Sequence, residues 1–362
     1  MARGRSPGQE VARGYDPGRV RLAVPASHSA LQLLRGARDE GVEAILIAHR
    51  RYYDAIYSRF PWLYSRAIVV ESWRDLLAPS VVGQLREANA VLVPHASLIE
   101  YVGVETLLSL ELPVLGNRYL LEIEASWDRK LSLLEDAGID TPRRFSSPRE
   151  ATEAGVPVIV KLPGAKGGRG YRLAAPRDVE RVAGELEKRG YKLEDLVIQE
   201  YVVGVRLYSH YFNSLVHGRV ELLGMDIRLE SNVDGLARVP PRLQEELGLE
   251  PSYTVVANMP IVARESLLAR VLDYGERFAR AVEMATGYPA AGPYSLEGIV
   301  TENLEYKIFE FSGRIVAGTN VYTGLQTPYA SLYWEDPMYM GRRIARELRE
   351  AAGKGILEKI VT

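Results

Sequence analysis

Residues 157–171 read PVIVKLPGAKGGRGY, in which a β-branched run leads through Lys161 into a glycine-rich loop around a second lysine, Lys166. The glycines of this loop are Gly164, Gly167, Gly168 and Gly170. Glycines let backbone N–H groups approach phosphate oxygens, and a lysine adds a compact positive charge. Of the 45 lysines and arginines only eight are lysines, so two of them in one short stretch indicate a specific use. The stretch predicts the phosphate-binding loop of a nucleotide-using enzyme.

The loop has neither the GxxxxGK[ST] pattern nor the GxGxxG pattern. This argues against a P-loop NTPase and against a dinucleotide-binding turn. The alternative interpretation is a hairpin with solvated charges, because a glycine-rich motif needs its structural context for confirmation.

The composition favours an enzyme that acts on small molecules. A chain of 362 residues with 47% apolar content buries two or three cores. The net charge of −2 argues against general nucleic-acid binding. The lack of cysteine excludes disulfides and thiolate chemistry and, with 25% charged residues, fits an intracellular protein from a hot habitat. No apolar run reaches the roughly 18 to 20 residues that span a bilayer, and no signal peptide is evident, so we expect a cytoplasmic protein.

The first third of the chain alternates short apolar strands with helices, which predicts a parallel sheet covered on both faces. The expected strands cover residues 21–25, 43–48, 67–70, 90–94 and 112–116. Beyond residue 203 we expect mainly strands until a closing helix over residues 341–352. The predicted divisions are a loosely ordered extension (1–20), an N-terminal domain (21–121), a small domain with the glycine-rich loop (122–203) and a large domain (204–362).

Two polar turns follow strands of the predicted parallel sheet. Ser27, His28 and Ser29 come after the first strand, and the segment from His95 to Ser97 comes after the fourth. Such positions favour an anion, because strand ends and helix starts present free N–H groups. A serine that merely caps the helix explains the first turn equally well. We expect both turns to meet at one crevice.

Two carboxylates lie on segments that alternate as strands do. Glu297 is in PYSLEGIV and Glu310 is in YKIFEFSGRI, with Ser312 and Arg314 just beyond. If these strands pair, the two carboxylates form a site for Mg²⁺, which prefers oxygen ligands and often uses few carboxylates together with substrate phosphates. Glutamates on a solvated strand face are the alternative.

Two further segments carry polar residues next to apolar strands. In LVIQEYVVGV, Glu200 and Tyr201 end a strand, either as a plain strand end or as a hinge whose backbone reads adenine. In DIRLESNVD, the alternate residues from Asp226 to Asp234 are expected on one face of an extended segment, equally well explained as an exposed strand face.

With these pieces in chain order, the sequence resembles an ATP-grasp ligase. More narrowly, it is similar to the archaeal formate-dependent 5-formaminoimidazole-4-carboxamide ribonucleotide (FAICAR) synthetases of purine (IMP) biosynthesis. The resemblance covers residues 21–352. Its most specific carriers are SHSALQLLRGARDEG, VIVKLPGAKGGRGY, QEYVVGV, DIRLESNVDGLARVP, NMPIVARESLL and FEFSGRIVAGTN. It implies an α/β protein in which an ATP-grasp fold follows a Rossmann-like N-terminal domain with a parallel sheet.

The resemblance also implies roles for individual residues. The ribonucleotide side would consist of His28, Ser29, Ser97 and Asn258. The ATP side would consist of Lys130, Lys161, Gly164, Lys166, Gly167, Gly168, Gly170, Glu200, Tyr201, Val202 and Glu230. Glu297 and Glu310 would bind Mg²⁺ or Mn²⁺, while Arg314 and Lys166 would stabilise the reacting acyl phosphate.

The implied reaction joins formate to 5-aminoimidazole-4-carboxamide ribonucleotide (AICAR) through formyl phosphate, with ATP as co-substrate. The family also implies a trimer or hexamer. The chain departs from the family pattern at Ala26, at Ala96 and over residues 325–330 (LQTPYA), all on the ribonucleotide side. Two alternatives therefore stay open: a paralogous ligase for another small acid and amine, and a catalytically silent nucleotide-binding regulator.

Overall fold

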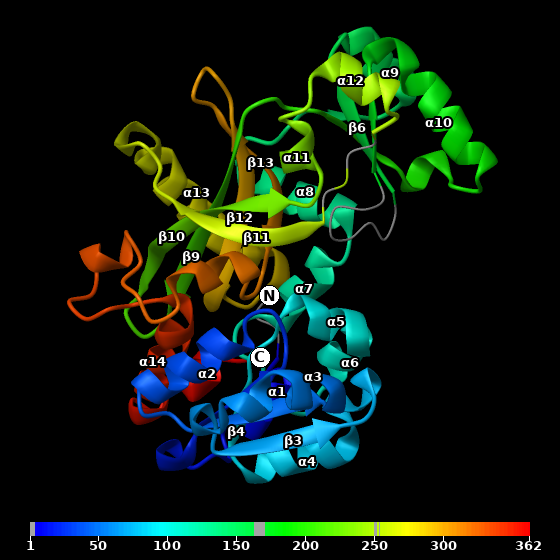
Figure 1. Ribbon diagram of the computed structural model, residues 1–362. Coiled ribbons are helices and arrows are strands. Elements are labelled where there is room, and N and C mark those ends of the chain that lie inside the picture. The colour runs from blue at the N-terminus through cyan, green and yellow to red at the C-terminus, as the bar shows by residue number, and fades with distance from the viewer. Residues whose placement is uncertain (1–3, 163–170, 250–251, 253) are drawn as a thin grey trace.

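The computed structural model describes residues 4–162, 171–249, 252 and 254–362. Its strands form three sheets, and these stack along the long axis of the molecule (Figure 1). A parallel sheet lies at one end, a large antiparallel sheet in the middle and a small antiparallel sheet in a lobe at the other end.

The parallel sheet has the strand order β3-β2-β1-β4. Its strands are β1 (Arg21–Pro25), β2 (Ala44–His49), β3 (Arg66–Val70) and β4 (Ala90–Leu92). The helices around it are α1 (Pro7–Ala12), α2 (Ala30–Asp39), α3 (Arg50–Ala55), α4 (Pro79–Glu87), α5 (Ala96–Val102), α6 (Val104–Ser109) and α7 (Arg118–Glu124). Alternate residues of β1 enter separate cores on the two faces, Leu22 with α2 and Ala23 with α4 and α5. The parallel sheet covered on both faces is therefore confirmed.

Two expectations for this region are wrong. Residues 112–116 form no named strand, and Val114 and Leu115 make only isolated bridges, to Leu92 and Val361. Pro113 contributes to this, because a proline has no N–H for a ladder. Within residues 1–20, expected to be loosely ordered, α1 is held by a capping box between Ser6 and Gln9.

The middle sheet has the order β11-β10-β9-β12-β13, with every pair antiparallel. Its strands are β9 (Val205–Ser214), β10 (Arg219–Glu230), β11 (Val255–Ile261), β12 (Gly292–Val300) and β13 (Tyr306–Ser312). The helices of this part are α8 (Trp127–Asp136), α11 (Val233–Leu236), α12 (Pro241–Glu246), α13 (Glu265–Thr286), α14 (Met340–Gly353) and α15 (Leu357–Ile360). The helix predicted over residues 341–352 is thus confirmed as α14.

The long helix α13 is absent from the sequence prediction, which expects mainly strands over this part of the chain. Its 22 residues pack one stripe against the middle sheet, with Leu267, Val271, Tyr274 and Phe278 buried at spacings of three and four. That spacing is the signature of an amphipathic helix, so the signal was present in the sequence.

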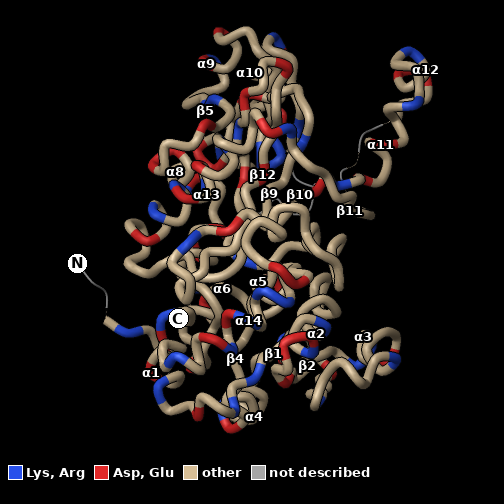
Figure 2. The backbone as a smooth tube through the Cα atoms, turned by 90° about the vertical axis from the view of Figure 1, so that its left-hand side faces the viewer, with Lys and Arg blue, Asp and Glu red and all other residues tan. Residues whose placement is uncertain are grey.

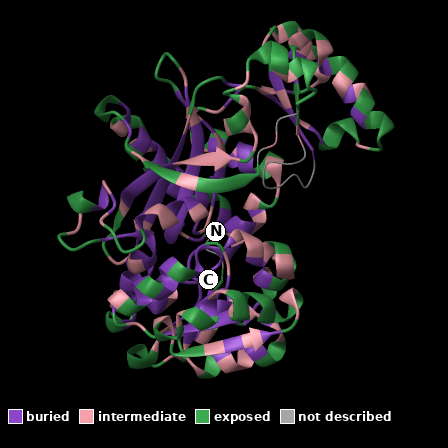
Figure 3. Cartoon of the chain, in the orientation of Figure 1, coloured by how far each residue is buried: buried purple, intermediate pink, exposed green. Residues whose placement is uncertain are grey.

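The small lobe contains a sheet of order β5-β8-β6-β7 with two covering helices (Figure 1). Its elements are β5 (Arg144–Phe145), β6 (Val158–Lys161), β7 (Tyr171–Ala174), β8 (Val197–Glu200), α9 (Pro148–Ala154) and α10 (Val179–Lys188). The core of this sheet is separate from those of the other two (Figure 3). Strands β6 and β8 are antiparallel and end at Lys161 and Glu200, so these two predicted nucleotide-side residues lie at opposite ends of the strand pair.

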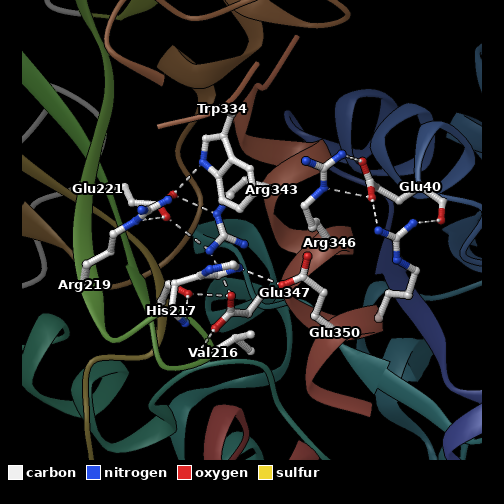
Figure 4. Close-up of polar contacts among 12 residues, drawn as sticks. Glu40, Val216, His217, Arg219, Glu221, Trp334, Arg343, Arg346, Glu347 and Glu350 are labelled. Carbon is white, nitrogen blue, oxygen red and sulfur yellow. Dashed lines mark hydrogen bonds and ion pairs between the residues drawn. The ribbon is translucent and has the colours of Figure 1, made fainter. Parts of the chain in front are cut away.

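Helix α14 returns from the middle sheet to pack on α2 of the parallel sheet (Figure 1). The two helices touch backbone to backbone, because a Cβ atom at Gly36 would overlap the peptide group of Gly341. Buried ion pairs on either side lock the crossing (Figure 4). Arg346 donates to Glu40 at 2.7 Å, and Arg343 donates to Glu221 at 2.8 Å. Helix α14 therefore joins the two larger sheets into one body.

Among the described residues, no helix is both long enough and apolar enough to cross a membrane.

We predict that Gly36→Ala lowers the free energy of unfolding by about 1 to 3 kcal/mol or more, because the new methyl group must push α14 away from α2. Gly83→Ala is the matched control, since Gly83 is also helical but has nothing within 4 Å of an added Cβ. It is expected to stabilise the protein by about 0.5 to 1 kcal/mol. Guanidinium denaturation measures both, and equal effects would contradict the tight crossing.

Candidate functional site

The two polar turns meet at the carboxyl ends of β1 and β4. Ser27 Oγ donates to Ser97 Oγ at 3.4 Å, and the rings of His28 and His95 lie edge to face with centroids 5.7 Å apart. The predicted convergence of the turns is confirmed. Ala26 and Ala96 lie within the same two turns.

Ser29 stands at the N-cap position of α2, but its side chain makes no capping hydrogen bond. Its Oγ donates to the carbonyl of Val316 at 3.3 Å and lies 2.7 Å from His28 Nδ1. Because the hydroxyl has one proton, this arrangement places the imidazole proton on Nδ1, where it donates to Ser29. Nε2 of His28 is then the unprotonated ring nitrogen, which can accept a hydrogen bond.

Both histidines are neutral near pH 7. Burial, together with the positive charges of Arg314 and Arg228, lowers the pKa of His28 to about 4. His28 is nevertheless exposed to water, although protein atoms surround much of its ring. Burial, His28 and Arg314 also hold the pKa of His95 well below its usual value. His95 Nδ1 caps α5 by accepting from Leu98 N at 3.1 Å.

A tryptophan whose ring is contacted by two lysines forms the centre of the predicted nucleotide side. Lys130 Nζ lies 4.1 Å from the ring centroid of Trp127, and Lys161 Nζ lies 4.2 Å from it. Both lysines are buried, with exposures of 6% and 5%. Lys130 also contacts Glu310 at 2.6 Å, whereas Lys161 Nζ has no hydrogen-bond partner among the described residues.

The unpartnered Lys161 ammonium indicates an anion site. Burial lowers its pKa to about 8, because desolvation and the nearby Lys130 outweigh the attraction of Glu310. A buried charge without a partner is costly in a folded protein, and such groups gather at functional sites. The anionic oxygens of a bound ligand, such as the phosphates expected here, would supply the missing acceptors.

Glu297 and Glu310 are directly opposite each other on β12 and β13, which confirms the predicted pairing of these strands. Glu297 accepts from Arg228 at 2.6 Å and from Ser312 Oγ at 3.1 Å. Burial would raise the pKa of Glu310, but Lys130, Lys161 and Arg228 together lower it, so this carboxyl is ionised near pH 7.

The paired carboxylates fit a hard divalent cation that completes its shell with phosphate oxygens and water. No group of three or more metal-binding side chains occurs in the part of the chain that the structure describes.

Arg314 lies beside the two polar turns that carry His28 and His95, and it is paired with Glu124. Its Nη2 donates to Glu124 Oε1 at 2.8 Å, and the same carboxylate accepts from Gly313 N at 2.9 Å. Arg314 Nε is buried without a partner among the described residues. The guanidinium therefore keeps one free donor next to the two histidines.

The predicted adenine hinge lies at the end of β8. Glu200 accepts from Lys307 Nζ at 3.3 Å, and Tyr201 N donates to Pro157 O at 2.8 Å. Val202 is buried and its backbone has no hydrogen-bond partner among the described residues. Glu230, expected on the same side, forms an ion pair with Arg206 at 2.5 Å.

The alternating run from Asp226 to Asp234 was expected on one face of a single strand, and the structure shows that this expectation is wrong. Asp226, Arg228 and Glu230 are on β10, whereas Asn232 is at the N-cap position of α11 and Asp234 lies inside that helix. The Asp234 side chain accepts from Glu230 N, and this contact ends the strand. Asn258, expected on the ribonucleotide side, is on β11 and donates to Asp226 at 2.7 Å.

The predicted residues Gly164, Lys166, Gly167, Gly168 and Gly170 lie outside the described residues. The sequence analysis assigned no role to Trp127, Arg228 or Glu124. A tryptophan three residues before Lys130 on one helix was a usable signal, because such spacing places both side chains on one face. The pairings of Arg228 and Glu124 join residues far apart in the chain, and no local pattern indicates them.

Two family models match the chain: a protein of unknown function (DUF1246) over residues 22–145 and a domain of unknown function (DUF1297) over residues 178–362. A protein from Ignicoccus hospitalis named 5-formaminoimidazole-4-carboxamide-1-(beta)-D-ribofuranosyl 5'-monophosphate synthetase is 48% identical over 97% of this chain and 99% of its own length. A protein of the same name from Pyrobaculum neutrophilum is 47% identical over 96% of this chain and 95% of its own length.

Solved structures show the same fold. An IMP biosynthesis protein PurP from Thermococcus kodakaraensis has a TM-score of 0.74 at 30% identity, with 94% of this chain and 100% of that chain covered. A biotin carboxylase from Campylobacter jejuni has a TM-score of 0.66 at 16% identity, with 92% and 71% covered. These likenesses confirm the predicted ATP-grasp fold behind an N-terminal parallel α/β region.

We predict that Lys161→Met stabilises the free protein near pH 7 by up to about 3 kcal/mol, since each pKa unit corresponds to about 1.4 kcal/mol. The pKa of Lys161 is lowered from 10.5 to about 8, so its ionised form costs stability below pH 8. That cost disappears as the pH rises from 8 towards 10.5, and the difference between variant and wild type should shrink over this range. Guanidinium denaturation at several pH values measures it. A less stable variant at pH 7 would show that the charge supports the fold.

Proposed function

Because the chain belongs to the family of 5-formaminoimidazole-4-carboxamide ribonucleotide synthetases, we propose that it formylates 5-aminoimidazole-4-carboxamide ribonucleotide with formate and ATP in purine biosynthesis. It is an ADP-forming carboxylate–amine ligase of the ATP-grasp class. The observation that carries this function is the 48% identity over 97% of the chain. The buried lysines and opposed carboxylates support it, because a silent regulator needs neither.

The reaction has two steps. A formate oxygen attacks the γ-phosphorus of ATP, the bond to the β-phosphate oxygen breaks, and formyl phosphate and ADP result. The 5-amino nitrogen of the ribonucleotide then attacks the formyl carbon, phosphate leaves, and the nitrogen loses a proton. Such phosphoryl transfer depends on positioning and charge neutralisation more than on protein acids and bases.

The ATP side of the site binds through charge and backbone. The unpartnered Lys161 and its neighbour Lys130 bind phosphate oxygens, and the free backbone of Val202, beside Glu200 and Tyr201, binds the adenine edge. Glu230 holds the ribose. Lys166 and the loop glycines complete the phosphate contacts in this proposal.

Glu297 and Glu310 hold a divalent cation, Mg²⁺ or Mn²⁺, which offsets the charge of the phosphates when bound. The two carboxylates are acceptors only and face each other from paired strands, so their chemistry fits such an ion. Arg314, with its free Nε atom, stabilises the acyl phosphate.

The acceptor side consists of His28, Ser29, Ser97 and Asn258. Neutral His28 offers an acceptor nitrogen at the mouth of the crevice, and the hydroxyls of Ser29 and Ser97 line the same turns. The departures at Ala26, Ala96 and residues 325–330 leave these side chains in place.

We also assign the protein to the cytoplasm, where its substrates are available.

The test incubates the protein with ATP, Mg²⁺, formate and the aminoimidazole ribonucleotide and measures ADP and formylated product. We predict that Glu297→Gln and Glu310→Gln each lower kcat by about 10²-fold or more, because each removes a charge from the cation site. Glu302→Gln is the control, since Glu302 is exposed in the turn between the same strands. ADP release without formylated product in the wild type would point to another acid and amine. Wild-type kcat in either variant would refute the cation site.

The family resemblance implies a trimer or hexamer. We further propose that copies of this chain associate through β11 and the segment before it. Strand β11 is an edge strand with both faces exposed (Figure 3), and α12 stands away from the body (Figure 2). Exposed edges with apolar side chains promote pairing between chains. The exposed apolar residues here include Leu247 at 60%, Val256 at 67% and Val262 at 65%.

We predict that the double variant Val256→Lys and Val262→Lys shifts the protein towards smaller species in sedimentation velocity, because two buried charges oppose association. Met284→Lys is the control: Met284 is 77% exposed on α13, away from β11. A monomeric wild type, or an unchanged double variant, would contradict this interface.

A further inference from the structure

A buried histidine–aspartate pair lies directly behind Asn258. His210, Asp226 and Asn258 come from the neighbouring strands β9, β10 and β11. His210 Nε2 is 2.8 Å from Asp226 Oδ1, and Asn258 Nδ2 donates to Asp226 Oδ2 at 2.7 Å. Asp226 is 0% exposed and His210 is 1% exposed. Each carboxylate oxygen therefore has one partner.

The chemistry of these groups fixes the amide of Asn258. An ionised carboxylate only accepts hydrogen bonds, so the NH₂ group of Asn258 must face Asp226 and its carbonyl oxygen must point away. Burial alone would raise the pKa of Asp226, but His210, Arg228 and Asn258 together lower it, so the carboxyl is ionised. A neutral carboxyl in this place would permit either amide orientation.

The surrounding structure leaves Asp226 no room to turn. A Cβ atom on Gly318 would overlap the carboxylate, so this glycine of the 3₁₀ helix η7 (Ala317–Tyr322) presses against it. The same helix reaches the acceptor turn, where Asn320 Nδ2 donates to the backbone carbonyl of His28. Helix η7 thus lies between the buried pair and the turn that carries His28.

We propose that the His210–Asp226 pair is a positioning device for the acceptor substrate, holding Asn258 with its carbonyl oxygen towards the crevice. This inference rests on the proposed function and assigns a chemical preference to one of its contacts. At Asn258 the site takes a hydrogen-bond donor of the substrate, an N–H or O–H group such as a carboxamide, amine or ribose hydroxyl. A substrate that has only a hydrogen-bond acceptor at that position would place it against the carbonyl oxygen of Asn258. The two acceptors repel each other, so such a substrate binds the protein less tightly.

The variant Asn258→Asp separates positioning from a merely structural role. When the carboxyl introduced at position 258 is protonated, its hydroxyl donates to Asp226 and its carbonyl oxygen points outward, as that of asparagine does. When the introduced carboxyl is ionised, Asp226 repels it, and two carboxylates that share a site raise the pKa of one of them. We therefore expect the KM for the ribonucleotide to exceed that of the wild type by about 10-fold at pH 8 and to approach it towards pH 6, the loss corresponding to about one hydrogen bond.

The measurement is the KM of variant relative to wild type at each pH, for the ribonucleotide and for ATP separately. Dividing the KM of the variant by that of the wild type at each pH cancels the pH dependence that both proteins share. That shared dependence comes from the phosphate of the substrate and from the titratable and charged groups around Asp226. Those groups are His210 on β9, Arg228 on β10 and Tyr322 on η7. The KM for ATP should not change, and thermal melts at the same pH values monitor folding.

Two further variants complete the test. In the double variant that combines Asn258→Asp with Asp226→Asn the second carboxylate is gone, so the pH dependence of the KM ratio should disappear. His217→Ala is the matched control, because it removes another histidine–carboxylate pair, with Glu350 at 2.7 Å, on α14 (Figure 4). It should leave both KM values unchanged.

The outcomes distinguish this inference from the function on which it rests. A wild type that gives no formylated product overturns the proposed function and this inference with it. A wild type that formylates, together with an Asn258→Asp variant whose KM ratio is flat with pH or rises equally for ATP, overturns the inference alone. A pH-dependent ratio that persists in the double variant also overturns it, because Asp226 would then not be its cause.

Discussion

The backbone contact between α2 and α14 holds the site together. Helix α2 starts just after the turn that carries Ser27, His28 and Ser29, and α14 follows the segment that packs on the middle sheet, so their crossing fixes how the parallel sheet and the middle sheet lie against each other. Two glycines, Gly36 and Gly341, permit the close approach, and the buried pairs of Glu40 with Arg346 and Glu221 with Arg343 fix it. Removing one partner of such a pair leaves a buried charge, which is strongly destabilising.

The site itself gives up stability for function. Each predicted cation ligand is balanced by a basic side chain, Glu297 by Arg228 and Glu310 by Lys130, while Lys161 has no such partner among the described residues. Under the proposed function, the phosphates of ATP supply the acceptors that Lys161 lacks, and a divalent cation adds positive charge beside the two carboxylates. The free protein therefore carries an uncompensated buried ammonium, which an anionic ligand would stabilise.

The sequence was sufficient where chemistry follows local pattern. The polar turns at Ser27–Ser29 and His95–Ser97 could be placed on one sheet edge because parallel strands end together, and Glu297 and Glu310 because strands alternate. Trp127, Arg228 and Glu124 were not assigned, since their partners lie on other elements and only the fold brings them together. Helix α13 was missed although its periodicity was visible, and Pro113 turned an expected strand into isolated bridges.

The position of the Trp127 ring beside both Lys130 and Lys161 makes this indole an optical probe built into the enzyme. Two ammonium groups about 4 Å from the ring act on its excited state through the same electrostatics that attract a cation to its face. Phosphates that draw these ammonium groups towards themselves alter the field on the indole. Of the chain's four tryptophans, Trp127 is the one with both lysine ammonium groups over its ring among the described residues, so a change in its emission on phosphate binding would report the charge near these lysines without any added label.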